Sequence, residues 1–238
     1  AARRPAGGVR RPREAVGSML GGCRWVFGWA ALLVPLWGGA EPGPRGPEIR
    51  WEPGTFRAGG AKGFVELRNG DLLATRSAGG RQGSKVICSR SRDGGLTWET
   101  LGVIALDPTA GIDIGDGDLC ELRDGRILYS YRHNGQLGDG AGRTRYRIRV
   151  AESRDGGAHW TGHSTVEEVD ARQGESRGLW SSFLHETGDG RLQCYYDDEN
   201  AAWLAGFRRH QWLVMKTWDG ASCEWGSPVV VSRVRDPR

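Results

Sequence analysis

Three carboxylates stand in segments that connect predicted strands, where side chains are free to do chemistry. Asp116 belongs to the run Gly111–Asp118, and Asp198 and Glu199 end the run that begins at Cys194. Cleavage of a glycosidic bond usually needs two carboxyl groups, one to protonate the leaving oxygen and one to act as nucleophile or base. We therefore take Asp116, Asp198 and Glu199 as candidate catalytic acids. The alternative is that the Asp-Asp-Glu run is a solvated loop or a helix cap.

Cations and aromatic rings in the same segments suit the binding of a sugar. Arginines can fork around a carboxylate, and aromatic faces can stack on the C–H surface of a sugar ring. The candidate binding residues are Arg76, Arg132, His133, Trp180 and Tyr196. Aromatic residues near strand ends also pack between sheets. We assign that packing role to Tyr195 and the site-lining role to Trp180.

The sequence contains no motif typical of metal binding, nucleotide binding or a serine nucleophile. It has no Cys-x-x-Cys or Cys/His metal spacing, no nucleophile elbow and no phosphate loop. We therefore expect no metal and no cofactor.

An eight-residue repeat organises the sequence. The segments Ser91–Trp98 and Ser153–Trp160 are identical at six of eight positions, and Thr217–Trp225 is a looser copy that is one residue longer. Hydroxyl and carboxylate oxygens in such a motif can accept hydrogen bonds from turn N–H groups, and glycine supplies positive φ. We assign a structural role in these turns to Ser91, Asp93, Gly95, Trp98, Ser153, Asp155, Gly157, Trp160, Thr217, Asp219 and Trp225.

A second repeat alternates with the first. The segments Phe64–Leu73, Leu119–Leu128 and Phe183–Leu192 each place an Asn-Gly or Asp-Gly pair between apolar runs. This pattern predicts hairpins with type I′ turns, in which both central residues take positive φ. The repeating unit is then strand A, a tight turn, strand B, a longer loop, strand C, the eight-residue motif and strand D. The chain is predicted to be all-β.

The motif S-x-D-x-G-x-x-W is the Asp box, and with it the chain resembles the sialidase (neuraminidase) superfamily of six-bladed β-propellers over about residues 50–238. The resemblance implies three blades of six here, and hence a truncated sequence. It also implies that the Asp boxes lie at the back of the propeller. Ligand contacts are then expected at the opposite end, on the B-to-C and D-to-A connections.

Other segments are similar to the exo-arabinanase branch of that superfamily: Asp113–Gly117, Tyr131–Asn134, Gly178–Leu184 and Cys194–Glu199. In that branch a catalytic Glu follows Gly-Leu-Trp, whereas this chain has Ser181 there. The Phe-Arg-Ile-Pro motif of sialidases is reduced to Phe56-Arg57. The resemblance therefore implies an exo-glycosidase acting on terminal sugars of glycans, or a non-catalytic glycan-binding propeller.

Composition separates an N-terminal extension, residues 1–40, from the expected propeller, residues 41–238. Six of the 33 basic residues and one of the 29 acidic residues lie in the extension, so the remainder is close to balanced. No nucleic-acid surface is expected. The apolar run Trp25–Trp37 and the small residues after it suit a signal peptide over about residues 19–40. It is shorter than the roughly 20 residues that span a bilayer, so we expect a secreted protein without a membrane span.

Four cysteines lie outside the extension: Cys88, Cys120, Cys194 and Cys223. In an oxidising compartment they can form disulfides in three pairings. The first three sit in apolar strand patterns, so buried free thiols are the alternative.

Overall fold

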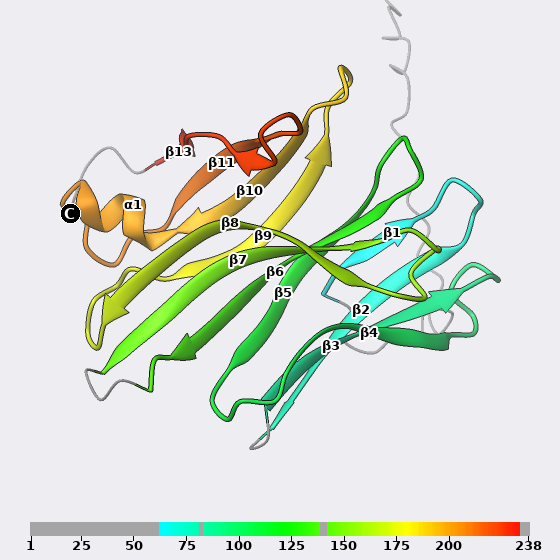
Figure 1. Ribbon diagram of the computed structural model, residues 1–238, viewed down its shortest axis with the longest axis horizontal. Helices are drawn as coiled ribbons and strands as arrows, with labels where there is room; N and C mark the ends of the chain where they lie inside the picture. Colours follow the sequence, from blue (N-terminus) through cyan, green and yellow to red (C-terminus); the bar gives the residue numbers. More distant parts are fainter. Residues whose placement is uncertain (1–61, 81–82, 139–141, 234–238) are drawn as a thin grey trace, which may run out of the picture. The chain divides into compact units, whose positions relative to one another are not determined.

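The computed structural model describes residues 62–80, 83–138 and 142–233, drawn in colour in Figure 1. The predicted signal segment and the Phe56-Arg57 pair lie outside the described residues.

Three antiparallel sheets follow one another along the chain (Figure 1). The first sheet contains β1 (Phe64–Glu66), β2 (Leu72–Gly80), β3 (Gly83–Ser91) and β4 (Glu99–Asp107). The second contains β5 (Asp113–Glu121), β6 (Ile127–Gln136), β7 (Arg143–Ser153) and β8 (Thr161–Arg172). The third contains β9 (Leu179–Glu186), β10 (Leu192–Asp198) and β11 (Trp212–Asp219), with β12 (Glu224–Trp225) and β13 (Val229–Ser232) both paired to β11. The predicted all-β fold and the A-to-D order of strands are confirmed.

The A-to-B hairpins have a different turn from the predicted type I′. Gly70 takes φ +87°, but the φ of Asn69 is not positive. The Gly70 N–H donates to Leu67 O at 2.8 Å, and the Leu67 N–H donates to Asp71 O at 2.8 Å. This is a type I turn followed by a left-handed glycine in a bulge. Gly125 and Gly190 make the same bonds, so the type I′ prediction was wrong in all three sheets.

The first two Asp boxes hold their hairpins as predicted. The Ser91 hydroxyl accepts the Gly95 N–H at 2.8 Å and donates to the Asp93 carboxylate at 2.7 Å. Asp93 also accepts the Thr97 N–H, and the indole N–H of Trp98 donates to Gly95 O at 3.0 Å. The second box repeats these bonds with Ser153, Asp155, Gly157, His159 and Trp160. Hydrogen bonds from the Thr97 hydroxyl, the Thr97 N–H and the Ser91 hydroxyl lower the pKa of Asp93 to about 2.

The third box departs from the pattern. Asp219 still accepts the Ala221 N–H at 2.9 Å, but the Thr217 hydroxyl lies against the Met215 sulfur instead of a turn N–H. The indole N–H of Trp225 reaches out of its hairpin to the Ser164 hydroxyl on β8, at 2.9 Å. The assignment of Thr217 and Trp225 to hairpin locking was therefore wrong, because the extra residue changes where both side chains point.

Two cores hold the three sheets together. One is built from the facing sides of the first and second sheets, with Leu73, Val86 and Tyr129 among its buried residues. The other lies between the second and third sheets and includes Ile148 and Tyr196.

The hairpin turns also join one sheet to the next. The Arg68 N–H donates to the Glu121 carboxylate at 2.8 Å, and the Arg68 guanidinium donates to Leu122 O. One repeat later, the Arg123 N–H donates to the Glu186 carboxylate, also at 2.8 Å. The same contact therefore recurs at both junctions.

Described cysteines are free thiols: Cys88 and Cys194 are buried, Cys120 is partly buried and Cys223 is exposed. Of the two alternatives left open by the sequence, the buried thiol holds for Cys88 and Cys194.

The helix α1 (Glu199–Leu204) has six residues, and no helix in the described ranges has the length and apolar character needed to cross a bilayer.

Ser153→Ala is expected to lower the free energy of unfolding by about 1–3 kcal/mol, because the buried Gly157 N–H loses its acceptor. Thr217→Ala, at the equivalent position of the divergent box, is the matched control and should cost less than about 1 kcal/mol. Urea unfolding followed by tryptophan fluorescence measures both. Equal losses in the two variants would contradict the structural difference between the boxes.

Candidate functional site

A bulge in β5 shapes the part of the chain where acidic residues gather. The pairing of β5 with β6 shifts between Gly115 and Asp118. Within the bulge Asp116 takes φ +47°, a left-handed conformation that non-glycine residues seldom adopt and that costs about 1–3 kcal/mol. Gly117 has no room for a side chain, because an added Cβ would collide with the carbonyl oxygen of Ser130. Such local strain is characteristic of functional sites.

The bulge turns Asp116 toward two cations. Its carboxylate is ion-paired to Lys62, just before β1, and to Arg132 on β6. Only 17% of the Asp116 side chain is exposed. Arg132 also donates to Asp113 at 2.8 Å. Asp116 is thus held as a charged carboxylate by groups from two sheets.

Asp118 lies in a different electrostatic environment. Burial raises its pKa to about 6, although the backbone N–H groups of Leu184 and Leu119 offset part of the rise. A carboxyl group with this pKa exchanges a proton near neutral pH, as a general acid or base must. Sequence reasoning missed Asp118. The signal was its place two residues after Asp116, at the end of the same acidic run Gly111–Asp118.

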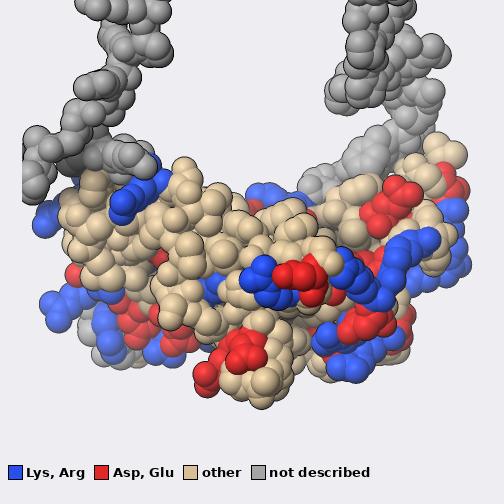
Figure 2. Space-filling model, turned by 90° about the horizontal axis from the view of Figure 1, so that it is seen from above, with Lys and Arg blue, Asp and Glu red and all other residues tan. Residues whose placement is uncertain are grey.

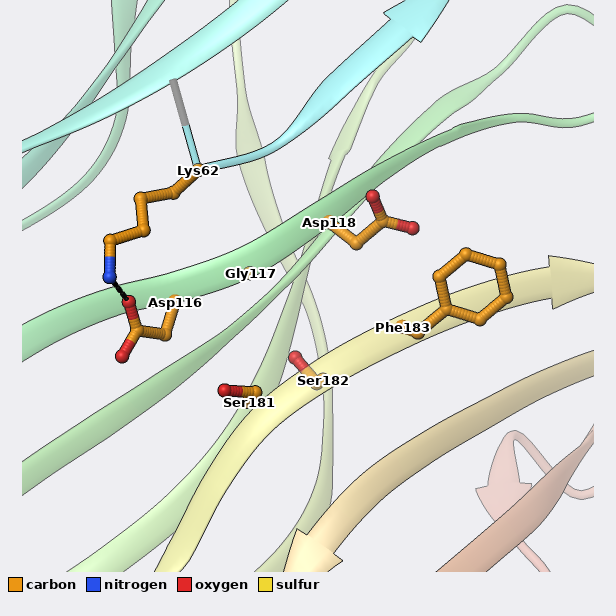
Figure 3. Close-up of a pocket in the computed structure, with 7 residues that line it drawn as sticks. All are labelled: Lys62, Asp116, Gly117, Asp118, Ser181, Ser182 and Phe183. Carbon is orange, nitrogen blue, oxygen red and sulfur yellow. Dashed lines mark hydrogen bonds and ion pairs between the residues drawn. The ribbon is translucent and has the colours of Figure 1, made fainter. Parts of the chain in front are cut away.

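The two acids line one cavity of about 290 Å³ (Figure 3). Its walls come from the start of the first sheet, from β5 and from β9: Lys62, Asp116, Gly117, Asp118, Ser181, Ser182 and Phe183. Figure 3 shows the Asp116 carboxylate turned toward Lys62 and the Asp118 carboxyl turned away from it, on the Phe183 side. The Ser182 hydroxyl donates to the Ser130 hydroxyl at 2.9 Å.

Asp198 and Glu199 lie outside this cavity lining and have structural contacts. Asp198 is 4% exposed and caps α1, accepting the Ala201 N–H at 2.7 Å. Glu199, in the first turn of α1, accepts the Gly178 N–H at 3.0 Å. The helix-cap alternative is therefore the one that the structure shows. Burial raises the pKa of Asp198, although the Ala201 N–H lowers it. The catalytic assignment of the two acids stays a prediction, and their carboxylates lie apart from the cavity.

The structure separates the two candidate arginines. Arg132 lies beside Trp180, with the guanidinium carbon 5.8 Å from the ring centroid. Ser77 lies against Gly115 of the second sheet, so its neighbour Arg76 lies on the opposite face of the first sheet. Arg76 is exposed there. Arg76 and Arg132 therefore do not fork around one group.

His133 is buried, with 5% exposure, on the side of β6 opposite Arg132. Its Nε2 lies 2.9 Å from the Asp107 carboxylate, at the end of β4. Burial and the nearby Arg147 lower its pKa, although hydrogen bonding to Asp107 raises it. The imidazole joins the first and second sheets and is not part of the cavity.

The two candidate rings differ in accessibility. Tyr196 is fully buried between the second and third sheets, and its hydroxyl is 3.4 Å from Glu167. Its assignment to sugar stacking was wrong, because no face of the ring is accessible. Trp180 is half-buried, at 5.8 Å from the Tyr146 ring, and its indole N–H has no hydrogen-bond partner among the described residues.

Charge is distributed in small clusters, and on the face shown in Figure 2 acidic and basic residues are interspersed. Within the described ranges, no three His, Cys, Asp or Glu residues are grouped so that they could hold a metal ion.

The fold is similar to that of solved glycoside hydrolases. The GH93 α-L-arabinofuranosidase of Fusarium graminearum, solved with arabinobiose, matches with a TM-score of 0.56 at 22% identity, over 78% of this chain and 52% of its own. The α-L-arabinanase of Penicillium chrysogenum, also with arabinobiose, matches with 0.56 at 21% identity, over 73% and 49%. The α-L-arabinofuranosidase of Lactobacillus brevis matches with 0.50 at 15% identity, over 72% and 53%.

This likeness shows that the three sheets have the arrangement of blades in a β-propeller. The chain spans about half the length of these solved proteins. No protein-family model matches the chain, and a search of curated proteins finds no match either.

Asp118→Asn is expected to stabilise the fold at pH 8 and to have little effect at pH 4. The pKa of Asp118 is raised from 3.8 to about 6, so the stability from its protonated form is complete below pH 4 and is lost as the pH rises through 6. Solvent screening reduces the gain to about 1 kcal/mol, or roughly 2–4 °C in Tm. Calorimetry at both pH values measures it. A carbon-13 NMR titration that places this pKa near 4 would contradict the assignment.

Proposed function

We propose that this protein is a glycoside hydrolase that removes terminal sugars from glycans, with Asp118 and Asp116 as the acids that these three sheets contribute. The observation that carries the proposal is the cavity in which one carboxyl has a pKa of about 6 and the other is ion-paired. Glycoside cleavage by acid and base catalysis uses two carboxyl groups in different environments, one that can carry a proton and one that is negatively charged.

Asp118 serves as the proton donor in this proposal. Near neutral pH part of the population carries a proton on its carboxyl, which can pass to the glycosidic oxygen as the C–O bond breaks. The sugar left behind develops positive charge at its anomeric carbon. Departure of the leaving group without a proton would create an alkoxide, so loss of this donor slows the reaction by about 10²–10⁴-fold.

Asp116 supplies the negative charge. Ion pairs with Lys62 and Arg132 fix the direction of its carboxylate, so that it can stabilise the developing positive charge or activate a water molecule. Arg132, which pairs with Asp116, also lies against the ring of Trp180. Trp180 and the exposed Phe183 offer apolar surface for a sugar ring near the carboxyls.

An arabinoside is the substrate class that we favour. Two of the similar solved structures contain arabinobiose. A sialoside needs several arginines around its carboxylate, and Arg76 faces away from Arg132. We also propose that the protein is secreted, because the apolar run Trp25–Trp37 lies within the predicted signal peptide of about residues 19–40.

The second candidate function is glycan binding without turnover. Ser181 lines the same cavity, at the position where the exo-arabinanase resemblance implies a catalytic Glu. A serine hydroxyl does not donate a proton readily near neutral pH, so the cavity can hold a sugar by hydrogen bonds and leave it intact.

Initial rates on 4-nitrophenyl α-L-arabinofuranoside, arabinan and a fluorogenic sialoside test both functions. Asp118→Asn is expected to lower kcat by at least about 10²-fold. Asp124→Asn is the matched control, because the Asp-Gly turn becomes an Asn-Gly turn that keeps its conformation. Its activity should equal that of the unchanged protein.

Two outcomes would decide against hydrolysis. Full activity in Asp118→Asn would remove Asp118 from the mechanism. Saturable binding of arabinobiose without turnover, lost in Asp116→Asn, would establish the second candidate function instead.

A further inference from the structure

A row of arginines lies along one face of β7. Arg143, Arg145, Arg147 and Arg149 alternate with Ile148 and Val150, which are buried between the second and third sheets. Since successive side chains of a strand point to opposite faces, the arginines lie on the face that the second sheet turns toward the first. They sit outside the Asp116 cavity.

Only part of this row is neutralised. Arg145 lies 2.8 Å from the Asp170 carboxylate and 3.2 Å from that of Glu168. Arg147 and Arg149 have no ion pair with any carboxylate of the described residues. Both are half-buried, so water screens them only in part.

The acids close to these two arginines are already bound. Glu168 lies opposite Arg147 in the strand pairing, but its carboxylate contacts Arg145. Asp107 accepts the Thr109 N–H at 2.9 Å and lies 2.9 Å from His133 Nε2.

His133 fixes the positions of both guanidinium groups. Because Asp107 accepts at Nε2, that nitrogen carries the proton, and Nδ1 is left to accept from Arg149 at 3.5 Å. Arg147 donates to the backbone oxygen of His133 at 3.4 Å, and its Nη2 lies 3.5 Å from Nε2 without a hydrogen bond, because both nitrogens carry protons. His133 therefore positions Arg149 through its neutral ring and Arg147 through its backbone carbonyl.

We propose that Arg147 and Arg149 form a binding site for an oxyanion, such as a sulfate or the carboxylate of an acidic sugar, on the face that the second sheet turns toward the first. Two adjacent guanidinium groups that form no ion pair repel each other, and an oxyanion that accepts hydrogen bonds from both offsets that repulsion. Burial and the charge of Arg149 lower the pKa of Arg147, although the more distant charges of Glu168 and Asp107 raise it. The site is independent of glycosidase activity, because it uses none of the cavity residues.

Thermal unfolding of the full chain in sodium sulfate and in sodium chloride at equal ionic strength tests this site. Sulfate stabilises proteins generally by exclusion from their surfaces, so the measured quantity is the excess rise in Tm over that background. At about 100 times the Kd, the excess should be roughly 5–10 °C. Sodium glucuronate, compared with glucose, tests the carboxylate of an acidic sugar in the same way.

Arg149→Gln and Arg147→Gln are expected to lose the excess and to raise the Tm in dilute chloride, because each removes one of two repelling charges. Arg145→Gln is the matched control on the same face of β7. Its charge is already compensated, so it should keep the full excess. Calorimetric titration of sulfate into the unchanged protein measures binding even if a variant does not fold.

Excess stabilisation by sulfate alone assigns the site to free sulfate or a sulfate ester, and excess by glucuronate alone assigns it to an acidic sugar. The proposal is overturned if neither anion gives an excess in the unchanged protein, or if Arg149→Gln keeps the excess that Arg145→Gln shows.

Discussion

Packing of one sheet face against the next is the constraint on which the rest of this structure depends. The strands form ladder hydrogen bonds only with strands of their own sheet. Contacts between sheets are therefore made by side chains and turns. The Arg68–Glu121 and Arg123–Glu186 contacts repeat at the two junctions, and each sits beside a core built from two sheets. Because each junction buries apolar side chains from both sheets, a sheet alone would leave its faces in water.

The candidate site follows from that packing. The β5 bulge lies on a strand that contacts both neighbouring sheets, so its acids meet groups from all three. Asp116 contacts Lys62 and Arg132, whereas Asp118 is covered by β9. The same strand therefore presents one charged carboxylate and one whose charge is disfavoured by burial. The arginine row of β7 lies on the face that the second sheet turns toward the first, outside the cavity of the two acids, and Arg147 and Arg149 form no ion pair with a described carboxylate there.

Local patterns gave correct predictions wherever a short segment decides its own conformation. Ser91–Trp98 and Ser153–Trp160 fold as expected because their hydrogen bonds join residues two to four positions apart. The hairpins were placed correctly, but their turn type was not. Asn-Gly and Asp-Gly suit two kinds of turn, and only the backbone shows that glycine alone takes positive φ. The third box is one residue longer, and its Trp225 donates to Ser164 on β8, 61 residues away, instead of within its own hairpin.

The sequence by itself determined the strand order and the positions of the turns. Its placement of the candidate residues in connecting segments was wrong, because Asp116, Arg132 and Trp180 lie within β5, β6 and β9. Tertiary structure decided which of them meet. The sequence predicts Asp198 and Glu199 as catalytic acids. In the structure they begin α1, and their carboxylates accept hydrogen bonds from backbone N–H groups. Asp118 became the strongest acid candidate only because β9 buries it. Charge state depends on burial and on partners distant in sequence, and neither is encoded in the spacing of residues along one segment.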